Sequence, residues 1–561
     1  LTPNLSEYSK TARSLYFQRI RFSMPLVDDF EDTLIHSISH LGIVAGAYDS
    51  LHIADVIDVA LPKTRHHHLS HAQVLKAMIL NGLGFVERRL YLFPDFFDDV
   101  AVERLLGEGV MREHLNDDVL GRTLDAIAAY GPTELFNEIV ASCLLPTDFG
   151  SHCIHVDTTN FSVTGAYEPD FDTGEIEITY GHPKDGRWDL KRFVLGMASN
   201  QCGVPLFLQT FSGNESDKET ILTIINQLKE NLKTDAKVYH VADAAFYTAP
   251  NLQNLGQHTF WISRAPATIK EVQELIGTED PFLSCADDRY GYQVHFSEYA
   301  GIRQKWVLYR SAPMHEREEK TFEKNLVKDL NRAKKSLRKL CAREFACAPD
   351  AQSAVETWLT KHPRCRLCEL ATTTITRKRE KKRGRPKNGE PVQLSYKISA
   401  EVEHIPEVLA EERRILGRFV LATNDPELSV DELLTNYKAQ SAIERGFRFL
   451  KDRSFRVAEI FLKKVSRIQA LAMVMVLCLF IYSLTEFRLR RELERTGETV
   501  TSQTKKQTQR PTLKWVFFRF RRVREFVVVE EGRRVKRVAN LNEELWKILR
   551  LLGREYEKYY T

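Results

Sequence analysis

Five side chains in the C-terminal half of the sequence have types and a spacing that suit phosphate chemistry. If their segment forms a helix, Tyr437, Gln440, Glu444, Arg448 and Lys451 share one stripe, while apolar residues take the other faces. A carboxylate beside cations and neutral hydrogen-bonding groups could hold a hard divalent metal ion that also contacts phosphate. The alternative is a solvated face on which Glu444 and Arg448 form an ordinary helix ion pair.

Two aspartates at the ends of predicted strands favour the metal site. Residues 153–157 alternate in polarity and end at Asp157, and residues 238–243 end at Asp243. The carboxyl ends of strands in α/β sheets usually hold the functional site, although a single strand-end aspartate often only caps the next turn or helix. Together with Glu444, the two aspartates offer the oxygen ligands that Mg²⁺ prefers.

These three acidic residues also carry a resemblance to a known family. Asp157, Asp243 and Glu444 resemble the D-D-E triad of RNase H-like insertion-sequence transposases. Residues 214–217 are similar to the segment that this group has between its two aspartates, and the resemblance extends over about 157–484. It implies an α/β fold built on an RNase H-like mixed sheet flanked by helices.

The segment around Glu444 is similar to the Y-x2-R-x3-E-x6-K signature of one large subgroup of these transposases. Tyr437, Glu444 and Lys451 stand at three of its positions, and Gln440 stands where the signature has Arg. The resemblance implies that Tyr437, Gln440, Arg448 and Lys451 contact DNA phosphates near the metal. Gln440 does not carry the positive charge of the Arg in the signature, so its contact with phosphate would differ from the family pattern.

The resemblance implies a DNA transposase that cuts phosphodiester bonds at the ends of its element and joins 3′-hydroxyls to target DNA. The implied cofactor is a pair of Mg²⁺ ions, for which Mn²⁺ may substitute, held by Asp157, Asp243 and Glu444. The implied partners are duplex DNA with terminal inverted repeats, target DNA and a second copy of the chain in a synaptic complex. Two other functions stay open: an RNase H-like nuclease acting on other structured nucleic acid, and a domesticated DNA-binding protein without catalytic activity.

Composition describes an ordinary globular chain, whose charge is unevenly distributed. The 561 residues carry 80 Lys and Arg against 76 Asp and Glu, a net charge of +4 that does not by itself indicate a nucleic-acid protein. Residues 1–150 have 12 basic and 21 acidic side chains (12 − 21 = −9), whereas residues 505–537 have 12 and 3 (12 − 3 = +9). This asymmetry predicts a basic surface towards the C-terminal end.

Cysteine usage and hydropathy favour a soluble protein in the cytoplasm, and the resemblance implies a bacterial one. Nine cysteines form no regular disulfide framework, which indicates a reducing compartment. Residues 468–485 are free of charge and could just span a bilayer, but a buried core helix is the favoured interpretation. We therefore expect no membrane partner.

Patterning predicts a mixed sheet within a chain of several domains. Strands are expected at 153–157, 161–165, 192–199, 205–210, 238–243 and 259–263, with a helix near 218–230. The interval between Asp243 and Glu444 is too long for one connection and predicts a large insertion. The expected domains are an N-terminal arm (1–30) and a helical domain for end binding or dimerisation (31–150). They are followed by a catalytic domain in two segments (151–265 plus 413–485), the insertion between these segments (266–412), and a basic linker with a small C-terminal domain (486–561).

The insertion contains two further candidate DNA contacts. Arg383, Arg385 and Lys387 belong to a basic run whose Arg-Gly-Arg-Pro core resembles an AT-hook, which would enter a narrow minor groove; a solvated loop is the alternative. Trp306 could stack on a flipped base, as the resemblance suggests, although core packing also accounts for it. Zinc binding by Cys341, Cys347, Cys365 and Cys368 is disfavoured, because only one pair has a normal zinc spacing.

Overall fold

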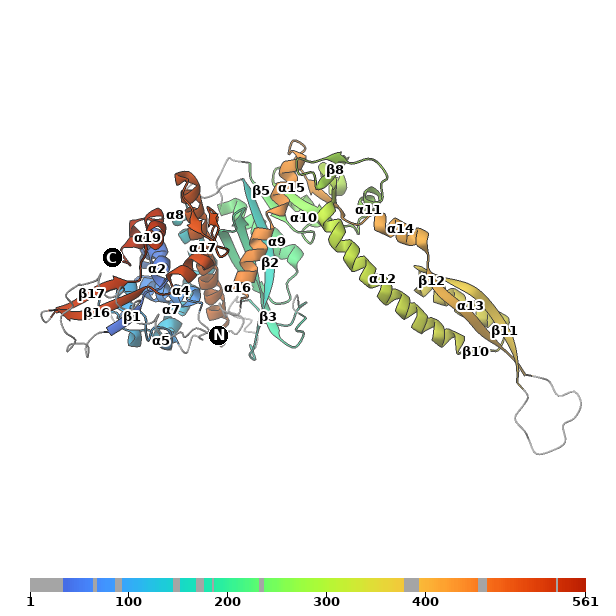
Figure 1. The fold of residues 1–561 in the computed structure, drawn as a ribbon, viewed down its shortest axis with the longest axis horizontal. Helices are drawn as coiled ribbons and strands as arrows, with labels where there is room; N and C mark the ends of the chain where they lie inside the picture. Colours follow the sequence, from blue (N-terminus) through green and yellow to red (C-terminus); the bar gives the residue numbers. More distant parts are fainter. Residues whose placement is uncertain are drawn as a thin grey trace, which may run out of the picture. The chain divides into compact units, whose positions relative to one another are not determined.

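The computed structural model divides the chain into two compact units (Figure 1). The described residues are 34–63, 68–85, 93–144, 152–167, 176–183, 186–231, 237–377, 393–452, 462–530 and 533–561. One unit, which we call the terminal unit, joins the described residues up to Tyr130 with Phe480–Thr561. The other, which we call the catalytic unit, comprises Gly131–Asp452 and the described residues up to Leu479.

A nine-stranded mixed sheet is the centre of the catalytic unit, with the strand order β4-β3-β2-β5-β6-β13-β9-β8-β7. The strands β2, β5 and β6 are parallel to one another, and the remaining pairings are antiparallel. Its strands are β2 (Cys153–Val163), β3 (Lys191–Asn200), β4 (Pro205–Ser212), β5 (Tyr239–Ala242), β6 (Phe260–Ala265), β7 (Leu283–Ser284), β8 (Tyr290–Ser297), β9 (Gln304–Ser311) and β13 (Arg418–Thr423). The expected mixed α/β sheet flanked by helices is confirmed.

Two differences from the predicted strands have simple causes. The strands expected at 153–157 and 161–165 are one strand, β2, because the Thr158-Thr159-Asn160 link carries two β-branched residues and no turn-forming Gly or Pro. Residues 283–311, expected within the insertion, add β7, β8 and β9 to the sheet through β13. The helix predicted near 218–230 is present as α9 (Asp217–Asn231).

Helices cover both faces of the sheet beside β2 and β3. On one face, α9 approaches so closely that a Cβ on Gly196 would lie 2.4 Å from the Ile224 side chain. On the other face, α16 (Ser441–Leu450) packs over Met197, since a Cβ on Gly446 would lie 3.4 Å from its terminal methyl. Burial on both faces explains why nine of the ten residues of β3 are buried.

The insertion proper begins after β9 and has a hydrophobic core of its own. Its elements are α12 (Ala312–Cys341), β10 (Glu344–Phe345), α13 (Ala348–Lys361), β11 (Cys365–Arg377), β12 (Gln393–His404) and α14 (Pro406–Arg414). Leu337, Phe345, Trp358 and Ile398 are members of one buried cluster that joins both long helices to the β10-β12-β11 sheet. We call residues 312–414 the inserted module.

The two ends of the chain fold together in the terminal unit, although the sequence suggests two domains. Strand β1 (Leu34–Ser37) pairs with β16 (Arg524–Glu530), which also pairs with β17 (Arg533–Ala539). The Tyr560 hydroxyl donates to the Ser39 carbonyl and accepts from the Ile43 amide. The helices of the terminal unit include α2 (Leu41–Ser50), α3 (Ile53–Ala60), α4 (His71–Leu83), α5 (Phe93–Phe96), α6 (Val102–Leu106), α7 (Asp117–Tyr130), α18 (Leu513–Phe520), α19 (Glu543–Leu552) and α20 (Arg554–Glu557).

The apolar segment 468–485 belongs to a long helix, α17 (Val465–Thr496). Within the described residues, α17 is the one helix long and apolar enough to cross a membrane. However, 78% of its most apolar window is buried inside the protein, as expected for a core helix. Helix α8 (Pro132–Cys143), predicted as part of the N-terminal domain, instead contacts β4 in the catalytic unit.

Candidate active site

The sheet register places the two predicted aspartates beside each other. Strands β2 and β5 are parallel, with Cys153 opposite Tyr239 and His155 opposite Val241. Asp157 lies two residues further along β2, and Asp243 directly follows the end of β5. Neighbouring strands are separated by about 4.8 Å, so the register brings two segments that are far apart in the sequence into the same part of the sheet.

Local hydrogen bonds hold each aspartate. One carboxylate oxygen of Asp157 accepts from the Thr158 amide at 2.7 Å, and one of Asp243 accepts from the Ala245 amide at 2.9 Å, where the chain turns after β5. The Thr158 hydroxyl donates to Asp217 in the first turn of α9 at 2.7 Å. Asp217, in the segment 214–217 that resembles the transposase pattern, therefore anchors the strand next to Asp157.

The Glu444 helix is interrupted, which the sequence does not indicate. Helix α15 (Val430–Lys438) ends before Gln440, and α16 begins at Ser441. Between them, the Ala442 amide donates to the Ala439 carbonyl at 2.8 Å, a tighter turn than an α-helix makes. The expected single stripe from Tyr437 to Lys451 is therefore divided, and its two ends are oriented by different helices.

Glu444 lies on the exposed side of α16, the helix that packs on β2 and β3. The face of the sheet under α16 is the one that carries Met197, which pairs with Asp157. The alternative ion pair is not formed, because neither Glu444 nor Arg448 has an ion-pair partner among the described residues. The Glu444 carboxylate is therefore available to a ligand.

Tyr437 connects the parts of this region. Burial raises the pKa of the Tyr437 hydroxyl, and the charges of Asp243 and Glu444 raise it further, while Arg264 lowers it. The hydroxyl is therefore within electrostatic range of Arg264, Asp243 and Glu444.

The other signature residues are placed differently. Gln440 is only 7% exposed, and its side-chain oxygen has no hydrogen-bond partner among the described residues, so it does not present a group to surface phosphate. The Arg448 side chain is exposed. The Lys451 ammonium lies 5.5 Å from the centre of the Phe161 ring on β2, four residues beyond Asp157 and on the same face.

Arg264 is a candidate site residue that the sequence reasoning missed. Strand β6 continues the parallel register, with Ala242 opposite Ser263, so Arg264 follows opposite Asp243. Its guanidinium lies over the Phe419 ring at 5.6 Å, and the side chain is half-buried. The only signal in the sequence was an Arg near the end of an apolar strand, and the strand register was needed to interpret it.

The proposed base contact of Trp306 does not agree with the structure. Its side chain is 2% exposed in β9, and the indole N–H donates to the Tyr247 hydroxyl and to Gln304, each at 3.0 Å. Trp306 therefore packs in the core, because its single polar atom is already satisfied inside the protein. Arg383, Arg385 and Lys387 lie outside the described residues.

The donor chemistry of the site fits a divalent metal ion, but the ligands do not yet converge. Asp157, Asp243 and Glu444 supply only carboxylate oxygens, the ligands of hard cations. Among the described residues, no group of three His, Cys, Asp or Glu side chains is arranged to hold a metal ion. Coordination by all three would require Glu444 to approach the aspartate pair. Cys365 lies in the apolar cluster of the inserted module, which also disfavours zinc there.

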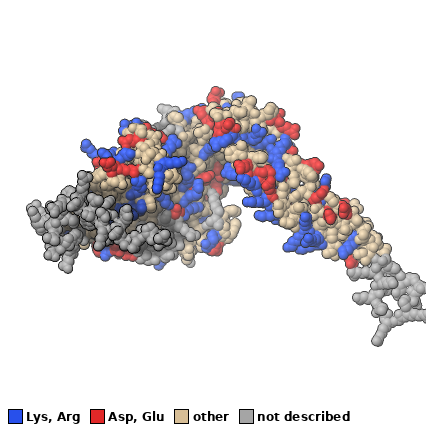
Figure 2. All heavy atoms as spheres, viewed as in Figure 1, with Lys and Arg blue, Asp and Glu red and all other residues tan. Residues whose placement is uncertain are grey.

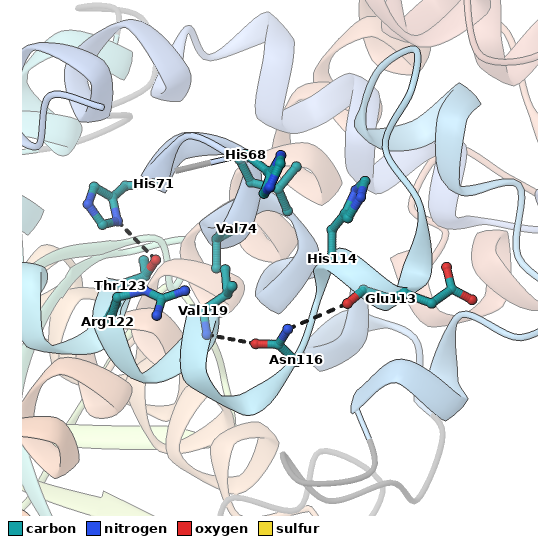
Figure 3. A pocket seen from close by; sticks show the side chains of 10 residues that line it. His68, His71, Val74, Glu113, His114, Asn116, Val119, Arg122 and Thr123 are labelled. Carbon is teal, nitrogen blue, oxygen red and sulfur yellow. Dashed lines mark hydrogen bonds between the residues drawn. The ribbon is translucent and has the colours of Figure 1, made fainter. Parts of the chain in front are cut away.

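A separate pocket of about 180 Å³ lies in the terminal unit (Figure 3). The His71 ring shares a hydrogen bond of 2.9 Å with the Thr123 hydroxyl, and the rings of His68 and His114 are parallel at 5.6 Å. Arg122 also lines the pocket. The pocket lacks paired carboxylates, so its chemistry differs from that of the aspartate pair.

Comparison with known families gives the family of the chain. Residues 150–481 match the family model described as a transposase DDE domain, which covers more than half of the chain and includes all three acidic residues. Residues 33–141 match a domain of unknown function (DUF4277). No curated protein matches the chain.

Proposed function

The chain belongs to the DDE transposase family, and from this membership we propose that it is the transposase of an insertion sequence. It would cut phosphodiester bonds at the ends of its element and join the 3′-hydroxyls to target DNA. Its substrate would be duplex DNA with terminal inverted repeats, brought together by two copies of the chain, in the bacterial cytoplasm. The observation that supports this most directly is the parallel pairing of β2, which carries Asp157, with β5, which Asp243 directly follows.

DDE transposases generally use divalent metal ions, and Asp157, Asp243 and Glu444 would hold two Mg²⁺ ions here, with Mn²⁺ as a substitute. When bound, such ions activate the attacking hydroxyl and stabilise the leaving oxygen of the phosphodiester. The backbone amides that hold Asp157 and Asp243 keep both carboxylates oriented before DNA arrives. Glu444 lies on helix α16, whereas Asp157 and Asp243 lie on or directly after strands of the sheet. Glu444 would therefore join the two aspartates as a metal ligand when DNA and metal bind.

Cations from two parts of the chain would orient the scissile phosphate. We infer that Arg264 on β6 supplies the positive charge that the family signature places at Gln440, because β6 pairs with the strand that Asp243 follows and the charge of Arg264 acts on Tyr437. Arg448 on α16 and Lys451, which directly follows this helix, would contact phosphates further along the strand. The Tyr437 hydroxyl would donate to a phosphate oxygen, since its raised pKa keeps the phenol protonated at neutral pH.

The test is the conservative variant Glu444→Gln, assayed on a DNA fragment that carries the terminal sequence of the element and its flank. With Mg²⁺ or Mn²⁺, strand cleavage should fall at least about 10³-fold, because a neutral amide is a poor ligand for a hard cation. Binding of the same fragment should be retained. Titration of Mn²⁺ by calorimetry gives a second readout, in which the variant should bind fewer ions or bind them more weakly.

A matched control is Glu407→Gln, an exposed glutamate in the first turn of α14. It should cleave like the unmodified protein. Full cleavage by Glu444→Gln would refute the triad. Cleavage without any joined product would instead favour a nuclease, and no metal-dependent cleavage by the unmodified protein would favour a DNA-binding protein without catalytic activity.

A further inference from the structure

Helix α12 of the inserted module has two halves with different charge balance. The first half alternates signs and makes ion pairs: Lys320 lies 2.7 Å from Glu316, and Arg413 of α14 lies 2.7 Å from Glu319. Between Lys324 and Lys339, the helix has seven basic residues and one acidic residue, Asp329. The positive charge of this second half is therefore not balanced within the helix.

Five of these cations share one exposed face. At about 100° per residue they fall within one narrow sector, which we call the basic stripe: Lys324, Lys328, Lys335, Arg338 and Lys339. The opposite face carries Leu326, Ala333, Leu337 and Leu340, which are buried. The core of the inserted module thus fixes the rotation of α12 and directs the stripe to solvent, as the Lys and Arg side chains along this part of the molecule illustrate (Figure 2).

Within the described residues, none of the five residues of the basic stripe forms an ion pair. Asp329, the one acidic residue between Lys324 and Lys339, is already engaged by Arg364 at 2.7 Å and by Arg332 at 3.6 Å. Like charges at i and i+4, such as Lys324 with Lys328 and Lys335 with Lys339, destabilise a free helix, and a polyanion would relieve this repulsion.

Duplex DNA fits the length and composition of the stripe. From Lys324 to Lys339 the helix rises about 22 Å, and a duplex carries one negative charge per roughly 1.7 Å of its axis, so every cation in the stripe can find a phosphate. The stripe contains no aromatic residue to stack on a base, and its apolar side is buried, so it cannot insert into a lipid surface. These properties favour contacts with the phosphate backbone alone.

We propose that the basic stripe of α12 binds the phosphate backbone of duplex DNA without reading its sequence. The inference rests on the proposed function, and it assigns DNA binding to a surface of the inserted module that is distinct from Asp157, Asp243 and Glu444. The inserted module then holds DNA by charge while the sheet supplies the chemistry. This contact should be strongly dependent on salt, because each neutralised phosphate releases counterions.

The experiment measures binding of a 30-base-pair duplex of arbitrary sequence by fluorescence anisotropy over a range of salt concentrations. The full-length chain is compared with Lys335→Gln/Lys339→Gln and with a quadruple variant that also carries Lys324→Gln and Lys328→Gln. The slope of log K against log salt should become shallower by about 1.8 in the double variant and about 3.6 in the quadruple variant. The basic run at 377–387 stays unchanged in every variant, so a loss cannot be assigned to it.

Two controls separate the stripe from general effects of charge and folding. A quadruple Lys→Arg variant at the same four positions keeps the charge and should bind like the unmodified chain. Lys505→Gln/Lys506→Gln removes two exposed cations from the terminal unit. It should reduce the slope of log K against log salt by less than Lys335→Gln/Lys339→Gln does. Circular dichroism of each variant should show unchanged helix content, because the substituted side chains face solvent.

The outcomes separate this inference from the proposed function. An unchanged slope in the quadruple Lys→Gln variant, with intact cleavage by the unmodified chain, would overturn the stripe and leave the transposase in place. A shallower slope with no cleavage by the unmodified chain would support the stripe and count against the proposed function. Equal losses in the two double variants, or stronger competition by a duplex RNA of the same sequence, would also overturn the assignment.

Discussion

Acidic side chains serve two different purposes in the two units. In the terminal unit, Asp49 lies 2.7 Å from the Lys76 ammonium and 2.9 Å from that of Lys558. Glu525, only 2% exposed, lies 2.5 Å from Arg104. In the catalytic unit, Glu444 is exposed and has no ion pair within the described residues. The same chemical group is ion-paired at Asp49 and Glu525 and left available at Glu444.

The difference shows how a functional carboxylate is distinguished from a structural one. Burial alone would raise the pKa of Asp49, but the charge and hydrogen bond of Lys76 lower it, so the carboxylate stays ionised as part of the fold. This pair joins α2 to α4, and the Tyr559 hydroxyl near the C-terminus binds both partners. An ion-paired carboxylate has little affinity left for a metal ion, whereas Glu444 has no competing cation within the described residues.

The largest effect on stability is expected when the buried pair of the terminal unit is broken. Lys76→Met leaves Asp49 without its closest cation and should lower the free energy of unfolding by about 3 kcal/mol, because a partly buried charge loses its partner. Hydrogen exchange of the α2 and α4 amides would measure the loss. Lys558→Met is the matched control: its side chain is 47% exposed, so it should cost under about 1 kcal/mol. Equal losses would contradict the contrast.

An effect of similar size, dependent on pH, is expected next to Asp157 on β2. His155 is fully buried two residues before Asp157, and burial lowers its pKa from 6.5 to about 4. Below pH 6.5 the unfolded chain therefore binds a proton at His155 that the folded chain does not bind. The free energy of unfolding should fall as the pH drops from 6.5 towards 4, by up to about 3 kcal/mol. Urea unfolding at pH 7 and pH 4.5 measures this change. Between these two pH values, the free energy of unfolding should fall less in His155→Leu than in the unmodified chain.

The control for this pH effect is His258→Gln, which replaces an exposed histidine and should leave the pH dependence unchanged. Part of the loss should remain in His155→Leu, because burial also lowers the pKa of His240 to about 4. An identical loss of stability in His155→Leu and the unmodified chain would show that His155 does not contribute.

The smallest predicted effect concerns the cation beside the aspartate pair. Arg264→Gln should reduce metal-dependent cleavage about 10- to 100-fold, equivalent to about 1–3 kcal/mol of transition-state stabilisation, without affecting the terminal unit. Arg264→Lys should retain part of the activity, since it keeps the charge but loses the fork of donors. Full activity of Arg264→Gln at both saturating and subsaturating DNA concentrations would show that Arg264 does not belong to the site.

Much of the catalytic fold could be predicted from the sequence, because its signals are local. Alternating polarity indicated the strands around Asp157 and before Asp243, and a helix was correctly expected near 218–230, although β2 continues past Asp157 to Val163. The break between α15 and α16 could not be predicted, since no Gly or Pro marks it. Arg264 and Gln440 were misjudged for a related reason: sequence spacing does not tell which side chain the neighbouring strand or helix brings to the site.

By itself, the sequence determined the residue types and local elements that make the chemistry possible: aspartates on or next to strands, and a helix that carries a glutamate. Only the tertiary structure decided that β2, β5 and β6 lie side by side in parallel, and that β1 pairs with β16 near the other end of the sequence. The physical reason is that periodicity is encoded over a few residues. Register and pairing depend instead on contacts between segments hundreds of residues apart, which no local pattern specifies.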